Sequence, residues 1–168
     1  NQNPLSPKVT TISRVPHFNN GHSIPGSRWG IDNPDSIYRV IPVDAEQSYM
    51  ISGQLGRQQF NENHFTLWDL NMKTIGLISG QDLETDKDGF FEISVDSAAA
   101  RGRKNHIQAK SGAKEFYIRD VMTNWLNDRP NILNIELLNR GHVAHKVPRP
   151  DELEICKRYM KKWATNTT

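Results

Sequence analysis

The feature that most constrains the fold is a run of short segments in which apolar and polar residues alternate. It is clearest over residues 106–138, HIQAKSGAKEFYIRDVMTNWLNDRPNILNIELL, where Ser111-Gly112 and the residues from Asn127 to Pro130 separate the segments. A period of two puts successive side chains on opposite faces, which is typical of half-buried antiparallel strands. We therefore expect this stretch to lie at the centre of an antiparallel sheet.

The rest of the chain contains similar segments. The predicted strands are 36–44, 48–55, 65–72, 74–78, 90–96, 107–109, 115–122 and 132–138. The first two flank a three-residue turn, which predicts an antiparallel hairpin, and Pro42 predicts an edge strand or a bulge because proline has no N–H for a ladder. Many short strands with no helix between them favour an antiparallel β-sandwich of jelly-roll type over a wound α/β sheet.

Both ends of the chain have a different pattern. Prolines and glycines recur through residues 1–35 and leave no room for a helix, so we expect an extended N-terminal arm wrapped over the core. Residues 148–164 place Leu153, Cys156, Met160 and Trp163 on one stripe, which predicts an amphipathic C-terminal helix. A length of 168 residues suits a single domain: arm 1–35, β-sandwich 36–138 and helix 148–164.

Charge and hydropathy exclude some kinds of partner. The 21 basic and 19 acidic residues leave a net charge of +2, so we expect no nucleic-acid partner. Apolar runs such as 75–78 are far shorter than a membrane-spanning helix needs. The one cysteine, Cys156, allows no intrachain disulfide and leaves the compartment open. The chain starts without methionine in a coil-like segment, so we expect it to be a piece of a longer protein.

A set of short motifs carries a family resemblance. They are Asn33-Pro34-Asp35, Ile37-Tyr38, the strand Ser48–Gly53, Asp88-Gly89-Phe90, Glu92-Ile93, Asn105, Ile118-Arg119-Asp120, Asn124-Trp125 and Ile135-Glu136. Together they resemble the bacterial domain of unknown function 1214 over about residues 29–138. The resemblance implies a β-sandwich of jelly-roll type and no agreed activity. The family commonly has tryptophan where this chain has His106, and an acidic residue in place of Asn124.

Arg119 and Asp120 are adjacent in one predicted strand, so only one of them can face a core. If Phe116, Ile118, Asp120 and Met122 face inward, the buried polar group is Asp120; if Tyr117, Arg119 and Val121 do, it is Arg119. A buried charge needs a partner, and the strand residues available for this are Arg39, Asp69 and Glu136.

Two functional hypotheses follow from these polar and aromatic residues. The first is a module that binds a small ligand or a partner protein through one sheet face, with ligand-binding candidates Arg39, Trp68, Asp120 and Trp125. The alternative is an enzyme acting on a small organic or carbohydrate substrate. Its site would combine residues of neighbouring strands: Arg39, His64, Asp69, Arg119 and Glu136.

Metal, phosphate and nucleophile sites are not favoured, and we expect no cofactor. His142 and His145 lack a third ligand at motif spacing, and the alternate carboxylates from Asp82 to Asp88 lack the glutamate of a calcium loop. The basic residues 101–104 suit a solvated loop, and Cys156 suits the apolar stripe of the helix. The arm and the helix could instead dock another chain, which would make the protein part of an oligomer.

Overall fold

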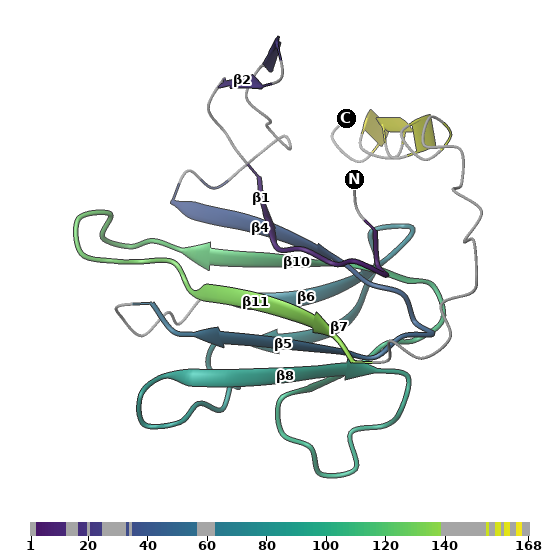
Figure 1. Cartoon of the computed structure of the whole chain (residues 1–168), viewed down its shortest axis with the longest axis vertical. Helices are drawn as coiled ribbons and strands as arrows, with labels where there is room; N and C mark the ends of the chain where they lie inside the picture. The colour runs from purple at the N-terminus through teal and green to yellow at the C-terminus, as the bar shows by residue number, and fades with distance from the viewer. Residues whose placement is uncertain are drawn as a thin grey trace.

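A computed structural model describes residues 3–12, 17–19, 21–24, 33, 35–56 and 63–138, together with 154, 157, 158, 160, 161, 164 and 165. These residues form a mainly β structure (Figure 1). Its strands are β1 (Thr10–Thr11), β2 (His17–Asn19), β3 (His22–Ile24), β4 (Ser36–Pro42), β5 (Tyr49–Gln54), β6 (His64–Asp69), β7 (Thr74–Ser79), β8 (Phe90–Asp96), β9 (His106–Gln108), β10 (Ala113–Val121) and β11 (Ile132–Leu137).

The strands form two main sheets and one small hairpin. The five-stranded sheet has the order β1-β4-β10-β6-β7, and all its pairs are antiparallel. The four-stranded sheet has the order β11-β5-β8-β9, in which β8 and β9 are parallel and the other pairs antiparallel. Strands β2 and β3 pair with each other. The prediction of purely antiparallel sheets is therefore wrong at β8–β9.

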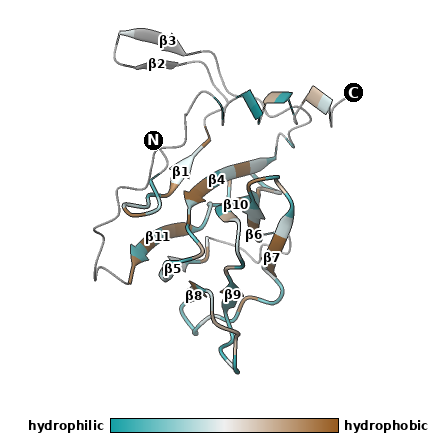
Figure 2. Cartoon of the chain, turned by 90° about the vertical axis from the view of Figure 1, so that its right-hand side faces the viewer, coloured by the Kyte–Doolittle hydropathy of each residue, from teal (hydrophilic) through white to brown (hydrophobic). Residues whose placement is uncertain are grey.

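One apolar core receives side chains from both sheets. Buried residues alternate with more exposed ones in β6 and β8, as the period-two pattern predicts, and Figure 2 shows hydrophobic positions within β4, β7 and β11. Phe65 of β6 and Phe91 of β8 meet edge to face, with ring centroids 5.6 Å apart and planes at 71°. The largest buried side chains of the core include Tyr49, Phe65, Phe116, Ile41, Ile51, Leu67, Ile93 and Ile118.

The predicted hairpin of residues 36–44 and 48–55 is wrong. Strand β4 pairs with β1 and β10, whereas β5 pairs with β11 and β8 in the other sheet. The Val43 N–H donates to the Lys114 carbonyl at 2.9 Å, which extends the β4–β10 ladder beyond Pro42. The chain then crosses from one sheet to the other over residues 44–48.

The two terminal segments are described only in part. Within the predicted arm, Thr10 and Thr11 pair with β4, and Val9 packs against the core. The predicted helix 148–164 lies mostly outside the described residues and stays a prediction. Cys156, His142 and His145 also lie outside them.

Tyr49 joins the N-terminal segment to β5. Its ring is fully buried, and its hydroxyl donates to the Pro4 carbonyl at 3.1 Å and accepts from the Asp44 N–H at 2.9 Å. Burial disfavours the phenolate and raises the pKa of Tyr49 to about 12 from a reference of 10.0.

Replacing Tyr49 with phenylalanine tests this connection. We expect a loss of about 1 kcal/mol in the free energy of unfolding at neutral pH, because the Asp44 N–H and the Pro4 carbonyl lose their partner. In the wild type the raised pKa means that the folded state holds more protons above pH 10, so stability falls as pH rises from 10 to about 12. Urea unfolding across this range should show that fall in the wild type and a smaller one in Tyr49→Phe; equal falls would contradict the account.

Candidate functional site

Asp120 of β10 faces the core and forms an ion pair with Arg39 of β4. Phe116, Ile118, Asp120 and Met122 are buried, so the first of the two predicted orientations is the one found. The carboxylate of Asp120 is fully buried and pairs with the guanidinium of Arg39. Burial lowers the pKa of Arg39 to about 10.

Asn131 connects this ion pair to the second sheet. Its backbone N–H and its Nδ2 donate to Asp120 at 3.0 and 3.4 Å, and its carbonyl accepts from Arg39. Its Oδ1 accepts from the Gly56 N–H at 3.0 Å, just after β5. Arg39 and Asp120, both ligand-binding candidates, therefore hold the connection from β10 to β11 in place and present almost no surface to a ligand.

The outer face of the five-stranded sheet brings together three other candidates. Arg119 is opposite His64 in register, and Trp68 stacks on Tyr117 with ring centroids 4.5 Å apart and planes at 8°. Tyr117 also contacts Tyr38 at 5.4 Å. His64, Trp68 and Arg119 thus share one aromatic surface.

The remaining catalytic candidates lie elsewhere. Asp69 ends β6 and accepts the N–H groups of Asn71 and Lys73 at 2.7 and 2.9 Å, so it shapes the turn before β7. Glu136 is exposed on β11 of the other sheet. The five residues of the enzyme hypothesis are therefore divided among the core, a turn and the outer faces of two sheets.

Trp125 lies on the connection between β10 and β11. It is 53% exposed, and its indole N–H donates to the Asp35 carboxylate at 3.1 Å. The buried Asp128 accepts from the Asn124 N–H at 2.6 Å and from the Thr123 hydroxyl at 3.1 Å, which fixes the loop. Trp125 is accessible, but it stands apart from both sheet faces.

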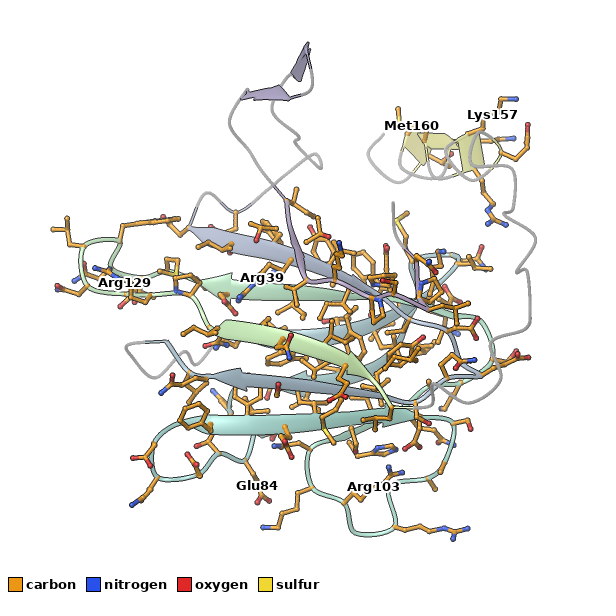
Figure 3. All side chains as sticks on the ribbon, viewed as in Figure 1. Arg39, Glu84, Arg103, Arg129, Lys157 and Met160 are labelled. Atoms are coloured by element: carbon orange, nitrogen blue, oxygen red, sulfur yellow. The ribbon has the colours of Figure 1, made fainter. Side chains whose placement is uncertain are left out.

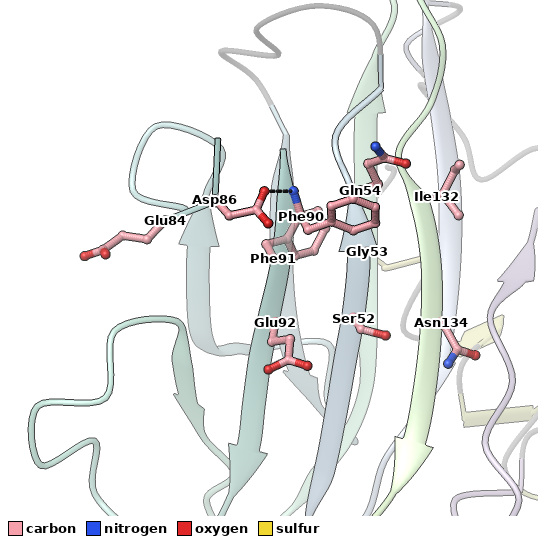
Figure 4. Close-up of a pocket in the computed structure, with 10 residues that line it drawn as sticks. All are labelled: Ser52, Gly53, Gln54, Glu84, Asp86, Phe90, Phe91, Glu92, Ile132 and Asn134. Carbon is pink, nitrogen blue, oxygen red and sulfur yellow. Dashed lines mark hydrogen bonds between the residues drawn. The ribbon is translucent and has the colours of Figure 1, made fainter. Parts of the chain in front are cut away.

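The outer face of the four-stranded sheet contains a cavity of about 580 Å³ (Figure 4). Phe90 and Ile132 are its exposed apolar residues, at 53% and 68% exposure. The cavity is also lined by three uncharged polar residues and three carboxylates: Ser52, Gln54 and Asn134, and Glu84, Asp86 and Glu92. In register, the side chains form two rows across the sheet: Ile132, Gln54 and Phe90 in one, and Asn134, Ser52 and Glu92 in the other.

A turn before β8 holds Phe90 in this position. The carboxylate of Asp86 accepts the N–H groups of Asp88 and Phe90 at 2.9 and 2.8 Å. Gly89 has φ of 80°, a conformation that favours glycine, and its carbonyl accepts from the Leu55 N–H at 2.8 Å. Asp86, one of the acidic residues from Asp82 to Asp88, therefore shapes the turn that leads into β8.

The sequence contains a signal for this face, although none of the predicted site residues lines its cavity. Phe91, Ile93 and Val95 share the inward face of their strand, so the aromatic ring of Phe90 must point outward. The sequence does not indicate that Gln54 and Ile132 lie beside Phe90. The pairing of β5 with β11 brings them there, and neither strand alone predicts that pairing.

His106 belongs to a closed polar cluster at one end of the same sheet. Its Nδ1 is 2.9 Å from the Ser94 hydroxyl, its Nε2 is 2.9 Å from the Ala98 carbonyl, and its side chain is 1% exposed. A hydrogen bond from Arg103 lowers the pKa of Asp96. Figure 3 shows Arg103 and Glu84 at the lower rim of the molecule, beneath β8. The cluster ties residues 97–105 to the sheet.

Two further observations concern the described residues as a group. Among them, no three histidine, cysteine, aspartate or glutamate side chains are grouped so as to hold a metal ion. No helix in the same part of the chain has the length and apolar character needed to cross a membrane.

The fold and this surface define a mainly β protein whose two sheets share one core and whose smaller sheet has a hollow outer face. No known family model matches the chain, and no curated protein sequence matches it. Its structure is similar to the crystal structure of an uncharacterized protein from Burkholderia cenocepacia, with a TM-score of 0.66 and 20% sequence identity. The similarity covers 96% of this chain and 42% of that protein, so this chain spans less than half its length.

Proposed function

We propose that this chain is a β-sandwich module of jelly-roll type that binds a small ligand through the outer face of the four-stranded sheet. The observation that supports this most directly is the cavity of about 580 Å³ around Phe90. Ligand sites in proteins combine apolar surface with a few polar groups that fix orientation, and this cavity has both. The resemblance to domain of unknown function 1214 over residues 29–138 supports the same fold class, and membership of that family is part of the proposal.

The groups around Phe90 favour a neutral or cationic ligand. Glu84, Asp86 and Glu92 border the cavity, so a ligand anion would be repelled. Gln54 lines the cavity, and its Nε2 donates to the Asp88 carbonyl at 3.4 Å, so its Oε1 remains available as an acceptor. We infer a small molecule with one apolar face, which stacks on Phe90, and with O–H or N–H donors around its edge, such as a sugar or an amine.

The enzyme hypothesis has less support. A general base must lie within hydrogen-bond reach of the substrate proton and of the group that orients it. Arg39 is in the core, Asp69 is in a turn, and Glu136 is on the other sheet from His64 and Arg119. The candidates that meet, His64 and Arg119, belong to an aromatic surface that could bind a partner.

Replacing Phe90 with alanine tests the proposal. Calorimetric titration with a panel of neutral sugars and small amines is expected to identify a binder, and Phe90→Ala should weaken its binding about tenfold, since an aromatic contact is worth about 1 kcal/mol or slightly more. Leu77→Ala is a matched control, because Leu77 is also 53% exposed but lies on β7 of the other sheet. Equal weakening by both substitutions, or binding unchanged by Phe90→Ala, would contradict a site at this face.

A further inference from the structure

Strand β11 is an edge of the four-stranded sheet in the part of the chain that the structure describes. The Leu138 N–H donates to the Ser48 carbonyl at 2.8 Å, so the even-numbered residues of β11 form the ladder with β5. The backbone N–H and C=O groups of Leu133, Ile135 and Leu137 consequently point away from β5. They are ready to pair with another strand.

This edge lacks the usual protection against pairing. Natural edge strands often contain lysine, proline or a bulge, whereas β11 has the sequence ILNIEL and pairs with β5 without a register shift. A cavity of about 620 Å³ lies between residues 134–137 and the N-terminal residues Leu5, Ser6 and Pro7. The edge therefore borders a space whose other side is formed by the N-terminal segment.

We propose that β11 of one copy pairs antiparallel with β11 of a second copy, with Ile135 on the two-fold axis. Antiparallel pairing of one strand with itself forms a closed two-fold interface. On the inner face, Leu133 then lies opposite the partner's Leu137, and Ile135 opposite the partner's Ile135. All of these residues are apolar, so the core-side surface of one copy continues into the other.

The side chains on the outer face of β11 favour the register with Ile135 on the two-fold axis. Ile132 and Leu138, which are 68% and 48% exposed, lie opposite each other across the axis. Asn134 lies opposite the partner's Glu136, and an amide can donate to a carboxylate. Moving the axis to Asn134 would put Ile132 against the partner's Glu136, and moving it to Glu136 would put two carboxylates together. Of the pairings about Asn134, Ile135 and Glu136, the one about Ile135 avoids both mismatches.

The dimer joins the two four-stranded sheets into one continuous sheet. Ile132 lines the cavity around Phe90, so the partner's Leu138 extends the apolar surface beside that cavity. The dimer does not depend on the proposed ligand, because backbone hydrogen bonds and side-chain contacts between the two β11 strands stabilise it. A mass measurement without ligand therefore tests it separately.

Light scattering during size exclusion of the full chain tests the pairing. The wild type is expected to have the mass of two 19.2-kDa chains, and Asn134→Glu the mass of one, because the new carboxylate faces the partner's Glu136. Adding Glu136→Lys to Asn134→Glu should restore the dimer by placing an ammonium opposite that carboxylate. Thr74→Glu makes the same charge change on β7, an edge of the other sheet, and should leave the dimer intact.

The remaining outcomes overturn the proposal. A wild-type chain with the mass of one chain from micromolar to submillimolar concentration would exclude the dimer. A dimer that persists in Asn134→Glu uses a different surface. Circular dichroism confirms that each variant is folded, and a folded double variant that stays a monomer would exclude the register about Ile135.

Discussion

Replacing Arg39 with alanine is expected to lower the free energy of unfolding by about 3–5 kcal/mol, which is a large part of the stability of a typical domain. The substitution leaves the fully buried carboxylate of Asp120 with only the N–H groups of Asn131 as partners. It also removes the donor to the Asn131 carbonyl, so the connection between β10 and β11 loses its tie to β4. Urea unfolding followed by circular dichroism measures the loss.

Two control variants separate burial from charge. Lys104→Gln breaks the ion pair between Lys104 and Glu84, whose side chains are 71% and 52% exposed respectively. This substitution should change the free energy of unfolding very little. Replacing Arg39 and Asp120 together with methionine and leucine should recover much of the loss, because no unpaired charge then remains in the core. A small effect of Arg39→Ala would mean that the pair is open to water.

Replacing Phe65 with alanine is expected to cost about 3–5 kcal/mol, the other large effect. Phe65 is fully buried on β6, between β10 and β7 of the five-stranded sheet, and its ring contacts Phe91 of the four-stranded sheet. Removing it leaves a cavity on the shared core. Thermal and urea unfolding should both show the loss, whereas Leu77→Ala on the neighbouring β7 should remain close to the wild type.

A double-mutant cycle tests whether the two sheets share that core. Phe65→Ala and Phe91→Ala together should be less destabilising than the sum of the single substitutions, with a coupling energy of about 0.5–1.5 kcal/mol for the edge-to-face contact. Additive effects would show that the two rings do not interact, and would contradict the contact between the sheets.

The positions of the strands could largely be predicted from the sequence. The expected strand 90–96 has the bounds of β8, and 132–138 differs from β11 by one residue. The alternation that predicts a strand depends on neighbouring residues along the chain, so the local pattern contains most of that information. The sequence allows two orientations of the strand that contains Asp120, because the pattern of a single strand does not show which face meets the core. The structure has the orientation in which Asp120 is buried against Arg39.

Pairing between strands could not be predicted in the same way. Strands β4 and β5 are adjacent in sequence and belong to different sheets, because β4 finds its partner in β10, more than seventy residues later. The parallel pair β8–β9 also depends on how the loop 97–105 folds back. The candidate site around Phe90 lies across three strands, so it could be recognised only once β11, β5 and β8 had been placed side by side.

Chemical-shift mapping by NMR tests the central claim most directly. The binder found in the calorimetric panel is titrated into the ¹⁵N-labelled full chain, and the backbone amides that shift are identified. Shifts centred on Ser52, Phe90, Glu92 and Asn134 are the predicted result. Shifts centred on His64, Trp68 and Tyr117 would place the binding face on the five-stranded sheet and contradict the account.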